Sequence, residues 1–204
     1  LWHALQFVKG KRLLKHNFKN ESLMEKTVSE AISYRRSVRL YKDQKIDDNK
    51  VRECIKNASI APNSSNLQLW EFYQVTAQHK LTALSAACFN QSAAKSAQQM
   101  VVFVSRKDLW KKRAHANMTH LNKGFEGIDL DERLLNRKKQ VNAYYSKIIP
   151  GIYTEFFGLF GLIKYMVCNA IGLFKPMYRQ TRLSDMRIVA HKSTALAAQN
   201  FMIS

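Results

Sequence analysis

The sequence has 204 residues, of which 46% are hydrophobic. It is therefore long and apolar enough to form one domain with a hydrophobic core, and a disordered chain is excluded. Its formal net charge of +18 indicates affinity for anions, whether a phosphate cofactor, nucleic acid or an acidic membrane. Its three cysteines are scattered and include no C-x-x-C pair. This pattern argues against a disulfide framework and against a structural zinc site, and it favours the reducing cytoplasm as the compartment.

The N-terminal third contains two predicted helices. Residues 1–20 form a basic lead-in without the apolar core of a signal peptide, and apolar residues recur with helical spacing from Glu21 to Ile32. A second helix is expected to begin after Asp47, a residue type that caps helices, and to end near Pro62.

The middle of the chain mixes strands and helices. The segment LWEFYQVTA, residues 69–77, is predicted to be a strand because it is rich in aromatic and β-branched residues. Helices are expected over 79–88 and 92–98. The apolar run MVVFVS, residues 100–105, is typical of a strand buried on both faces.

The C-terminal half is predicted to be helical, so the fold class is α+β. Residues 106–147 are charged and helical in character, with a break at Gly124 and Gly127. An amphipathic helix is expected over 186–204.

The apolar stretch 156–174, FFGLFGLIKYMVCNAIGLF, is long enough to suggest a membrane span. Lys164 lies at its middle, and a charge near the centre of a bilayer costs at least about 2.5 kcal/mol. We therefore expect a buried helical hairpin, or a lid that meets a partner subunit, in preference to a span.

Two motifs in residues 35–75 carry a family resemblance. The segment RRSVRLYKDQKIDDNKVRECIKNASIAPNSSNLQLWEFYQV resembles the opening of the FMN-dependent nitroreductase family. The family pattern is R-R-S-x-R, then a helix, an A-P-S-S-x-N-x-Q-P-W turn and a strand, in this order and at this spacing. The resemblance implies a three-layer fold with a central mixed sheet flanked by helices, over residues 21–204, with a variable helical insertion near 148–178.

The first motif is implied to hold the phosphate and ribityl tail of FMN. Its residues are Arg35, Arg36, Ser37 and Arg39. Arg35 and Arg39 are the phosphate candidates, since guanidinium groups bind phosphate bidentately. The alternative is an ordinary solvated helix end.

The second motif is implied to contact the flavin ring, typically from the other subunit. Its polar residues are Asn63, Ser64, Asn66 and Gln68. Asn63 stands where the family has Ser, and polar contact is still possible there. Leu69 stands where the family has Pro, and the loss of the proline leaves the turn less rigid. A plain capped turn is the alternative. Asn90 is a further candidate for flavin contact, with Lys95 as a nearby positively charged residue.

The implied function is an FMN-dependent oxidoreductase. Electrons pass by a ping-pong mechanism from NAD(P)H to a nitroaromatic, a quinone or a similar electron-poor small molecule, in a homodimer with FMN at the interface. We nominate no catalytic acid, base or nucleophile and no metal site. Dehalogenating or ring-cleaving chemistry on the same fold is left open.

The rival prediction is a basic, non-enzymatic module that binds an anionic membrane surface or nucleic acid. The sequence lacks zinc-finger spacing and an RNP-like segment, so we expect no nucleic-acid partner, and we disfavour membrane contact without excluding it. In the resembled family more chain follows the last helix, so we expect this sequence to be a piece truncated at its C-terminus.

Overall fold

The computed structural model describes residues 26–204 except 178 and 180, and it divides into two units, Leu1–Tyr34 and Arg35–Ser204. The described part of the first unit holds helix α1, Val28–Tyr34, which has no buried residue. Thr27 caps it, because its hydroxyl accepts from the Glu30 N–H while the Glu30 carboxylate accepts from the Thr27 N–H. The expected helix start at Glu21 lies outside the described residues. The predicted helical pattern from Glu21 to Ile32 included Thr27, which was wrong, because Thr27 precedes the first helical residue, Val28.

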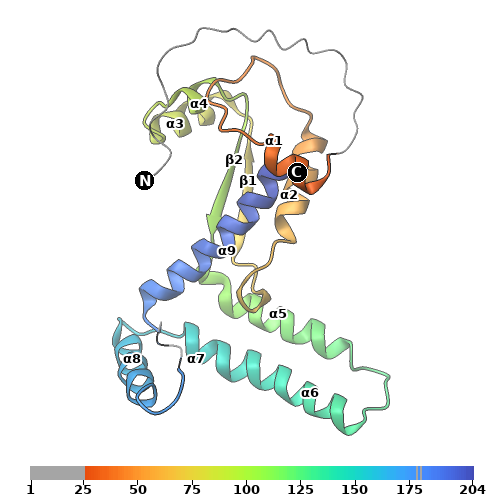
Figure 1. Ribbon diagram of the computed structural model, residues 1–204, viewed down its shortest axis with the longest axis vertical. Coiled ribbons are helices and arrows are strands. Elements are labelled where there is room, and N and C mark those ends of the chain that lie inside the picture. Colours follow the sequence, from red (N-terminus) through yellow and green to blue (C-terminus); the bar gives the residue numbers. More distant parts are fainter. Residues whose placement is uncertain (1–25, 178, 180) are drawn as a thin grey trace. The chain divides into compact units, whose positions relative to one another are not determined.

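The second unit contains helices, short helical turns and one two-stranded sheet (Figure 1). Its elements, in chain order, are α2 Asp48–Ser59, the 3₁₀ turn η1 Ser64–Asn66, β1 Trp70–Val75, α3 Gln78–Ala87, α4 Ser92–Ser96, β2 Met100–Ser105, the 3₁₀ turn η2 Lys107–Leu109, α5 Trp110–Lys123, α6 Glu132–Ala143, the π-helical turn η3 Tyr144–Ile148, α7 Ile149–Tyr153, α8 Leu159–Ile171 and α9 Leu183–Ile203.

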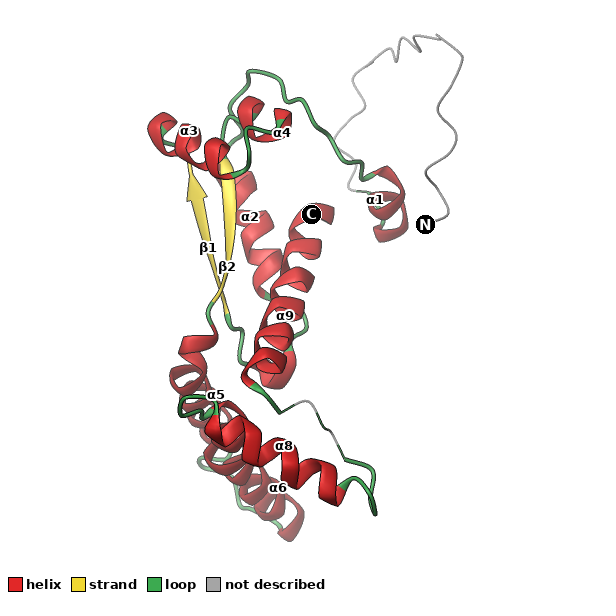
Figure 2. Cartoon of the chain, turned by 90° about the vertical axis from the view of Figure 1, so that its left-hand side faces the viewer, coloured by secondary structure: helices red, strands yellow, loops and turns green. Residues whose placement is uncertain are grey.

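The sheet pairs β1 with β2 in antiparallel register, with Trp70 opposite Ser105 and Val75 opposite Met100 (Figure 2). All six residues of β2 are half-buried, so the expectation of a strand buried on both faces was wrong. The reason is that the faces of β2 are unequally covered: besides β1, α9 is the element in the described part of the chain that packs substantially on β2, so a helix covers one face of the strand.

Helix α9 packs against both α2 and β2. Small residues make this approach close: Ala58 and Ala197 are fully buried there, beside Trp70. Phe103 of β2 stacks edge-on against Phe201 of α9, with ring centroids 5.4 Å apart. The α9 helix therefore closes one face of the sheet.

A second core joins the other end of α9 to the helices that follow β2. Its buried residues are Leu67, Leu69, Ala114, Ile149, Tyr153, Met186 and Ala190. Helices α5 and α6 run as neighbours and are joined by a loop in which Gly127 has φ of +72°, so the predicted break at the glycines is confirmed.

The apolar stretch 156–174 forms α8, and it is not the buried helical hairpin that the sequence predicts. Its apolar residues are largely exposed, because the helix turns its polar and small residues inward. No helix in the described part of the chain is long and apolar enough to cross a membrane.

Candidate functional site

The turn between α2 and β1 has unusual backbone geometry. Ser65, Asn66 and Gln68 all have positive φ, of 56°, 49° and 47°. A non-glycine residue in this region costs on the order of 1 kcal/mol, so the surrounding structure has to hold each one in place.

Asn63 holds the turn from within. Its side-chain oxygen accepts from the Gln68 N–H at 2.8 Å, and its side-chain amide donates to the Ala61 carbonyl at 3.2 Å. Both ends of this amide are therefore used inside the protein. This arrangement gives Asn63 a structural role in addition to the flavin contact that its position predicts.

Side chains from distant elements hold the turn from outside. Asn117 of α5 donates to the Asn66 carbonyl at 2.6 Å, and Tyr145 donates to the Ser65 carbonyl at 3.0 Å. The Tyr144 hydroxyl shares a 2.7 Å hydrogen bond with the Ser65 hydroxyl. Burial raises the pKa of Tyr145, so its hydroxyl stays a donor at neutral pH. Sequence analysis missed these three residues, because nothing local links them to the turn.

The remaining polar groups of the turn point to solvent. Ser64 and Asn66 are exposed and Gln68 is half-buried. Within the described residues, the Ser64 hydroxyl and the Gln68 side-chain amide have no hydrogen-bond partner. These groups are available to a ligand.

Gln68 also lines a cavity of about 380 Å³ at the start of β1. Its other lining residues are Ser59, Trp70, Glu71, Phe72, Tyr73 and Arg113. The lining of the cavity combines apolar side chains of β1 with polar and charged groups.

The arginine motif lies between α1 and α2. Arg35, Arg36, Ser37 and Arg39 are all exposed, and the segment forms neither helix nor strand. The Tyr41 N–H donates to the Ser96 hydroxyl at 3.0 Å, which ties the segment to the end of α4, next to Lys95. Within the described chain, the guanidinium groups of Arg35 and Arg39 have no hydrogen-bond or ion-pair partner.

Asn90 lies in the turn that ends α3, and it is exposed with φ of 54°. Its N–H donates to the Ser85 carbonyl at 2.8 Å. The arginine motif, the 63–68 turn and Asn90 come from three different parts of the unit. Among the described residues, no hydrogen bond or ion pair joins the arginine motif to the turn.

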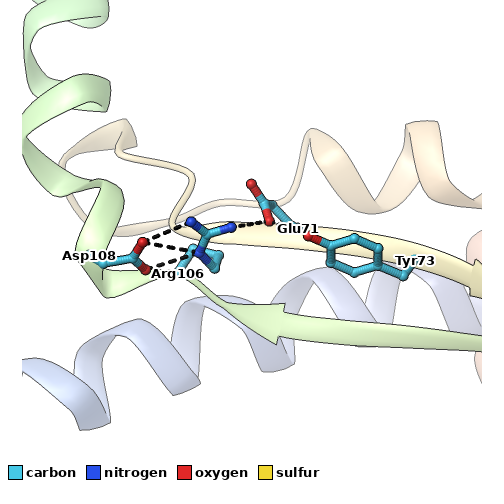
Figure 3. Close-up of polar contacts among 4 residues, drawn as sticks. All are labelled: Glu71, Tyr73, Arg106 and Asp108. Carbon is cyan, nitrogen blue, oxygen red and sulfur yellow. Dashed lines mark hydrogen bonds and ion pairs between the residues drawn. The ribbon is translucent and has the colours of Figure 1, made fainter.

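A charged cluster that the sequence did not reveal includes Glu71 and Tyr73 of the cavity lining. Figure 3 shows its side chains. The Arg106 guanidinium bonds Asp108 through two nitrogens, at 2.8 and 3.0 Å, and bonds Glu71 with a third. Tyr73 donates to the same Glu71 oxygen at 2.7 Å. The hydrogen bond from Tyr73 lowers the pKa of Glu71, and Arg106 lowers it further. The same Tyr73–Glu71 hydrogen bond raises the pKa of Tyr73.

This cluster predicts a pH dependence of stability. The folded-state pKa of Glu71 lies below the usual 4.5, so its stabilising effect is fully present above pH 4.5 and is lost as the pH falls through the folded pKa. Glu71→Gln should therefore flatten the acid side of a plot of unfolding free energy against pH. Arg106 and Glu71 each keep 29% of their side-chain surface exposed, so solvent screening keeps the effect modest.

The measurement is urea unfolding at several pH values between 3 and 7. Glu126→Gln is the control, because Glu126 is exposed and has no ion pair within the described chain. An acid limb equally steep in wild type and Glu71→Gln would show that the cluster does not act through the Glu71 charge.

Comparison with known proteins places these features in a family. A protein of Archaeoglobus fulgidus, proposed to be an NADH dehydrogenase/NAD(P)H nitroreductase, is 32% identical over 83 residues, which cover 37% of this chain and 48% of that protein. The chain thus spans about half the length of this curated relative.

Two solved structures share the fold. One is a proposed nitroreductase of Exiguobacterium sibiricum in complex with FMN, with a TM-score of 0.53 at 18% sequence identity. The match covers 88% of this chain and 69% of the chain of that protein. The other is a proposed NAD(P)H:FMN oxidoreductase of Staphylococcus epidermidis, with a TM-score of 0.55 at 16% sequence identity. That match covers 87% of this chain and 67% of the chain of the Staphylococcus protein.

These likenesses confirm the predicted α+β fold of the nitroreductase type. The sequence pattern of the Nitroreductase family matches residues 32–204, which include the arginine motif, the 63–68 turn, the sheet and α9. The chain therefore belongs to the Nitroreductase family.

Proposed function

We propose that the protein is an FMN-dependent oxidoreductase that takes electrons from NAD(P)H and passes them to an electron-poor small molecule. Family membership supports this proposal, as does the FMN bound to the similar Exiguobacterium sibiricum protein. The observation that carries it is a rigidly held turn with outward-facing polar groups, combined with an arginine motif that has two unengaged guanidinium groups.

The residues present fit FMN at both of its ends. Arg35 and Arg39 are exposed cations without partners in the described chain, as a doubly charged phosphate requires. At the other end, Ser64, Asn66 and Gln68 offer donors and acceptors that match the alternating carbonyls and ring nitrogens of a flavin. Arg36, Ser37 and Asn90 complete the set.

We propose a homodimer in which the turn of one subunit meets the FMN that the arginine motif of its partner holds. The lack of a direct bond between the two motifs in one described chain is in keeping with this arrangement. Turn residues held by Asn117 and Tyr145 would then present their amides to the flavin at little further entropic cost.

When bound, FMN would supply hydride and electron transfer between NAD(P)H and the acceptor, and a quinone acceptor would gain a hydride equivalent from NAD(P)H and one proton from solvent. The chain's own residues bind and orient: the arginines neutralise the phosphate, and the turn fixes the ring. We propose that NAD(P)⁺ leaves before the acceptor binds. Nitroaromatics and quinones are the acceptor class we propose.

The reducing cytoplasm is the compartment that we propose. NAD(P)H is available there, and the free thiols of Cys54, Cys88 and Cys168 are in keeping with it.

The test is an absorbance spectrum of the purified full-length protein, before and after anaerobic addition of NADPH. We expect a flavin band that bleaches on reduction and returns when a quinone is added. A colourless protein that takes up no added FMN would overturn the proposal. Steady-state rates with both substrates varied should give parallel double-reciprocal lines, and intersecting lines would reject the ping-pong order.

A further inference from the structure

Helix α8, Leu159–Ile171, has an apolar side and a side of small and polar residues. A helix packed on a core turns its apolar side inward, but α8 turns its apolar side outward. Gly161 and Cys168 are buried and Lys164 is half-buried, so the small and polar positions face the protein. The exposed positions are apolar: Leu162, Ile163, Met166 and Val167. The helix therefore presents an uncovered apolar face.

Polar contacts fix the inward face. The Lys164 ammonium donates to the carbonyls of Ile152 at 3.1 Å and Thr154 at 2.8 Å, and lies 3.9 Å from the Glu155 carboxylate. The same carboxylate accepts from the Gly161 N–H at 2.9 Å. These bonds set the rotation of the helix, and so they set which side faces outward.

Glycine makes this packing possible. A Cβ at Gly161 would lie 2.8 Å from the Glu155 carboxylate, and one at Gly172 would lie 2.7 Å from the Arg179 guanidinium. Arg179 also donates to the Gly172 carbonyl at 2.7 Å. The ends of the helix are thus held close to charged partners, and its apolar residues are left outside.

The turns on either side of α8 expose further apolar side chains. Phe157 is 96% exposed and Phe174 is 86% exposed, with Leu173 beside it. Exposed aromatic and aliphatic residues of this kind mark a surface that binds a partner, a membrane or a ligand.

Charge identifies what covers this face. Residues 156–184 contain four basic residues, Lys164, Lys175, Arg179 and Arg182, and no acidic residue. Lys164 faces the protein beside Glu155, so the exposed cations of the segment are Lys175, Arg179 and Arg182. A two-fold contact with a second copy would place this basic segment against itself, which like-charge repulsion opposes. An anionic phospholipid surface offers both an apolar layer for the phenylalanines and phosphates for the basic residues.

We propose that α8 and its flanking turns dock on an anionic membrane, lying in the interface between headgroups and acyl chains without spanning the bilayer. Phe157, Phe174 and the outer face of α8 enter the acyl boundary, and Lys175 reaches the lipid phosphates. This inference goes beyond the flavin chemistry and does not depend on it.

The test measures flotation of the full-length protein with phosphatidylcholine vesicles that contain or lack phosphatidylserine. We expect binding only to the vesicles with phosphatidylserine, and weaker binding as salt is raised. Replacing both exposed phenylalanines, Phe157→Ser with Phe174→Ser, should weaken binding by about tenfold or more. Lys175→Gln should weaken it about fivefold at low salt.

Two matched controls come from the same chain. Phe89→Ser removes a phenylalanine that is 90% exposed but lies after α3, and Lys80→Gln removes an exposed lysine of α3. Both should bind vesicles as wild type does.

The proposal is overturned if anionic vesicles do not bind the protein. It is equally overturned if Phe157→Ser with Phe174→Ser leaves vesicle binding unchanged but alters the oligomeric state in sedimentation, because the face would then be a protein interface. A colourless protein that still binds anionic vesicles would reject the proposed flavin chemistry and uphold the docking surface.

Discussion

Leu67→Ala is expected to lower the free energy of unfolding by about 3 kcal/mol, because truncating a fully buried leucine removes transfer free energy and leaves a cavity. Leu67 is only 1% exposed and packs in the cluster that includes Ile149 and Met186. The measurement is the urea midpoint at neutral pH, with the slope checked for a two-state transition.

Ile149→Ala is the matched comparison, since Ile149 is fully buried in the same cluster but lies outside the turn. Both variants should lose similar stability. Only Leu67→Ala should also weaken FMN binding, because Leu67 lies between Asn66 and Gln68 and anchors the turn. Equal effects of the two variants on FMN binding would mean that the core acts on the site only through global stability.

Features that depend on local sequence could be predicted. Asp47 was expected to cap a helix that ends near Pro62, and its carboxylate accepts from the Asn49 N–H at 3.0 Å at the start of α2. The break between α5 and α6 follows equally from Gly124 and Gly127. A cap or a turn is decided by a few neighbouring residues, so the sequence pattern contains the information needed.

Features that depend on long-range contacts could not be predicted. The bonds that Asn117, Tyr144 and Tyr145 make to the turn join residues 51, 79 and 80 positions apart. The outward apolar face of α8 was missed for a related reason. Periodicity shows that a helix has an apolar side, but only the packing of Lys164 and Glu155 decides which side faces the protein.

The two departures from the family turn now have a physical interpretation. The sequence predicts a less rigid turn because Leu69 replaces a proline, whereas Asn63, which replaces a serine, keeps a polar contact possible. In the structure Leu69 is buried in the core, and its carbonyl accepts from the Arg106 N–H at 2.9 Å. The Asn63 amide spans the turn from Ala61 to Gln68. Core packing and a side-chain bridge therefore supply the constraint that a proline would give.

Arg39→Gln is expected to raise the Kd for FMN at least tenfold in the full-length protein, and Arg35→Gln should act in the same direction. A hydrogen bond to a charged group contributes about 1.5–3 kcal/mol, which corresponds to at least a tenfold change in affinity. The measurement is a titration of the apoprotein with FMN, followed by quenching of flavin fluorescence.

Arg39→Lys separates charge from geometry. Lysine keeps the positive charge but lacks the planar fork that bonds two phosphate oxygens, so it should recover only part of the affinity. Arg137→Gln, an exposed arginine of α6, is the control for the loss of one positive charge from a very basic protein. Because Arg39 is exposed and unpaired in the described chain, its replacement should leave the urea midpoint unchanged. If Arg39→Gln and Arg137→Gln bind FMN alike, the arginine motif does not hold the phosphate, and its charge has another role.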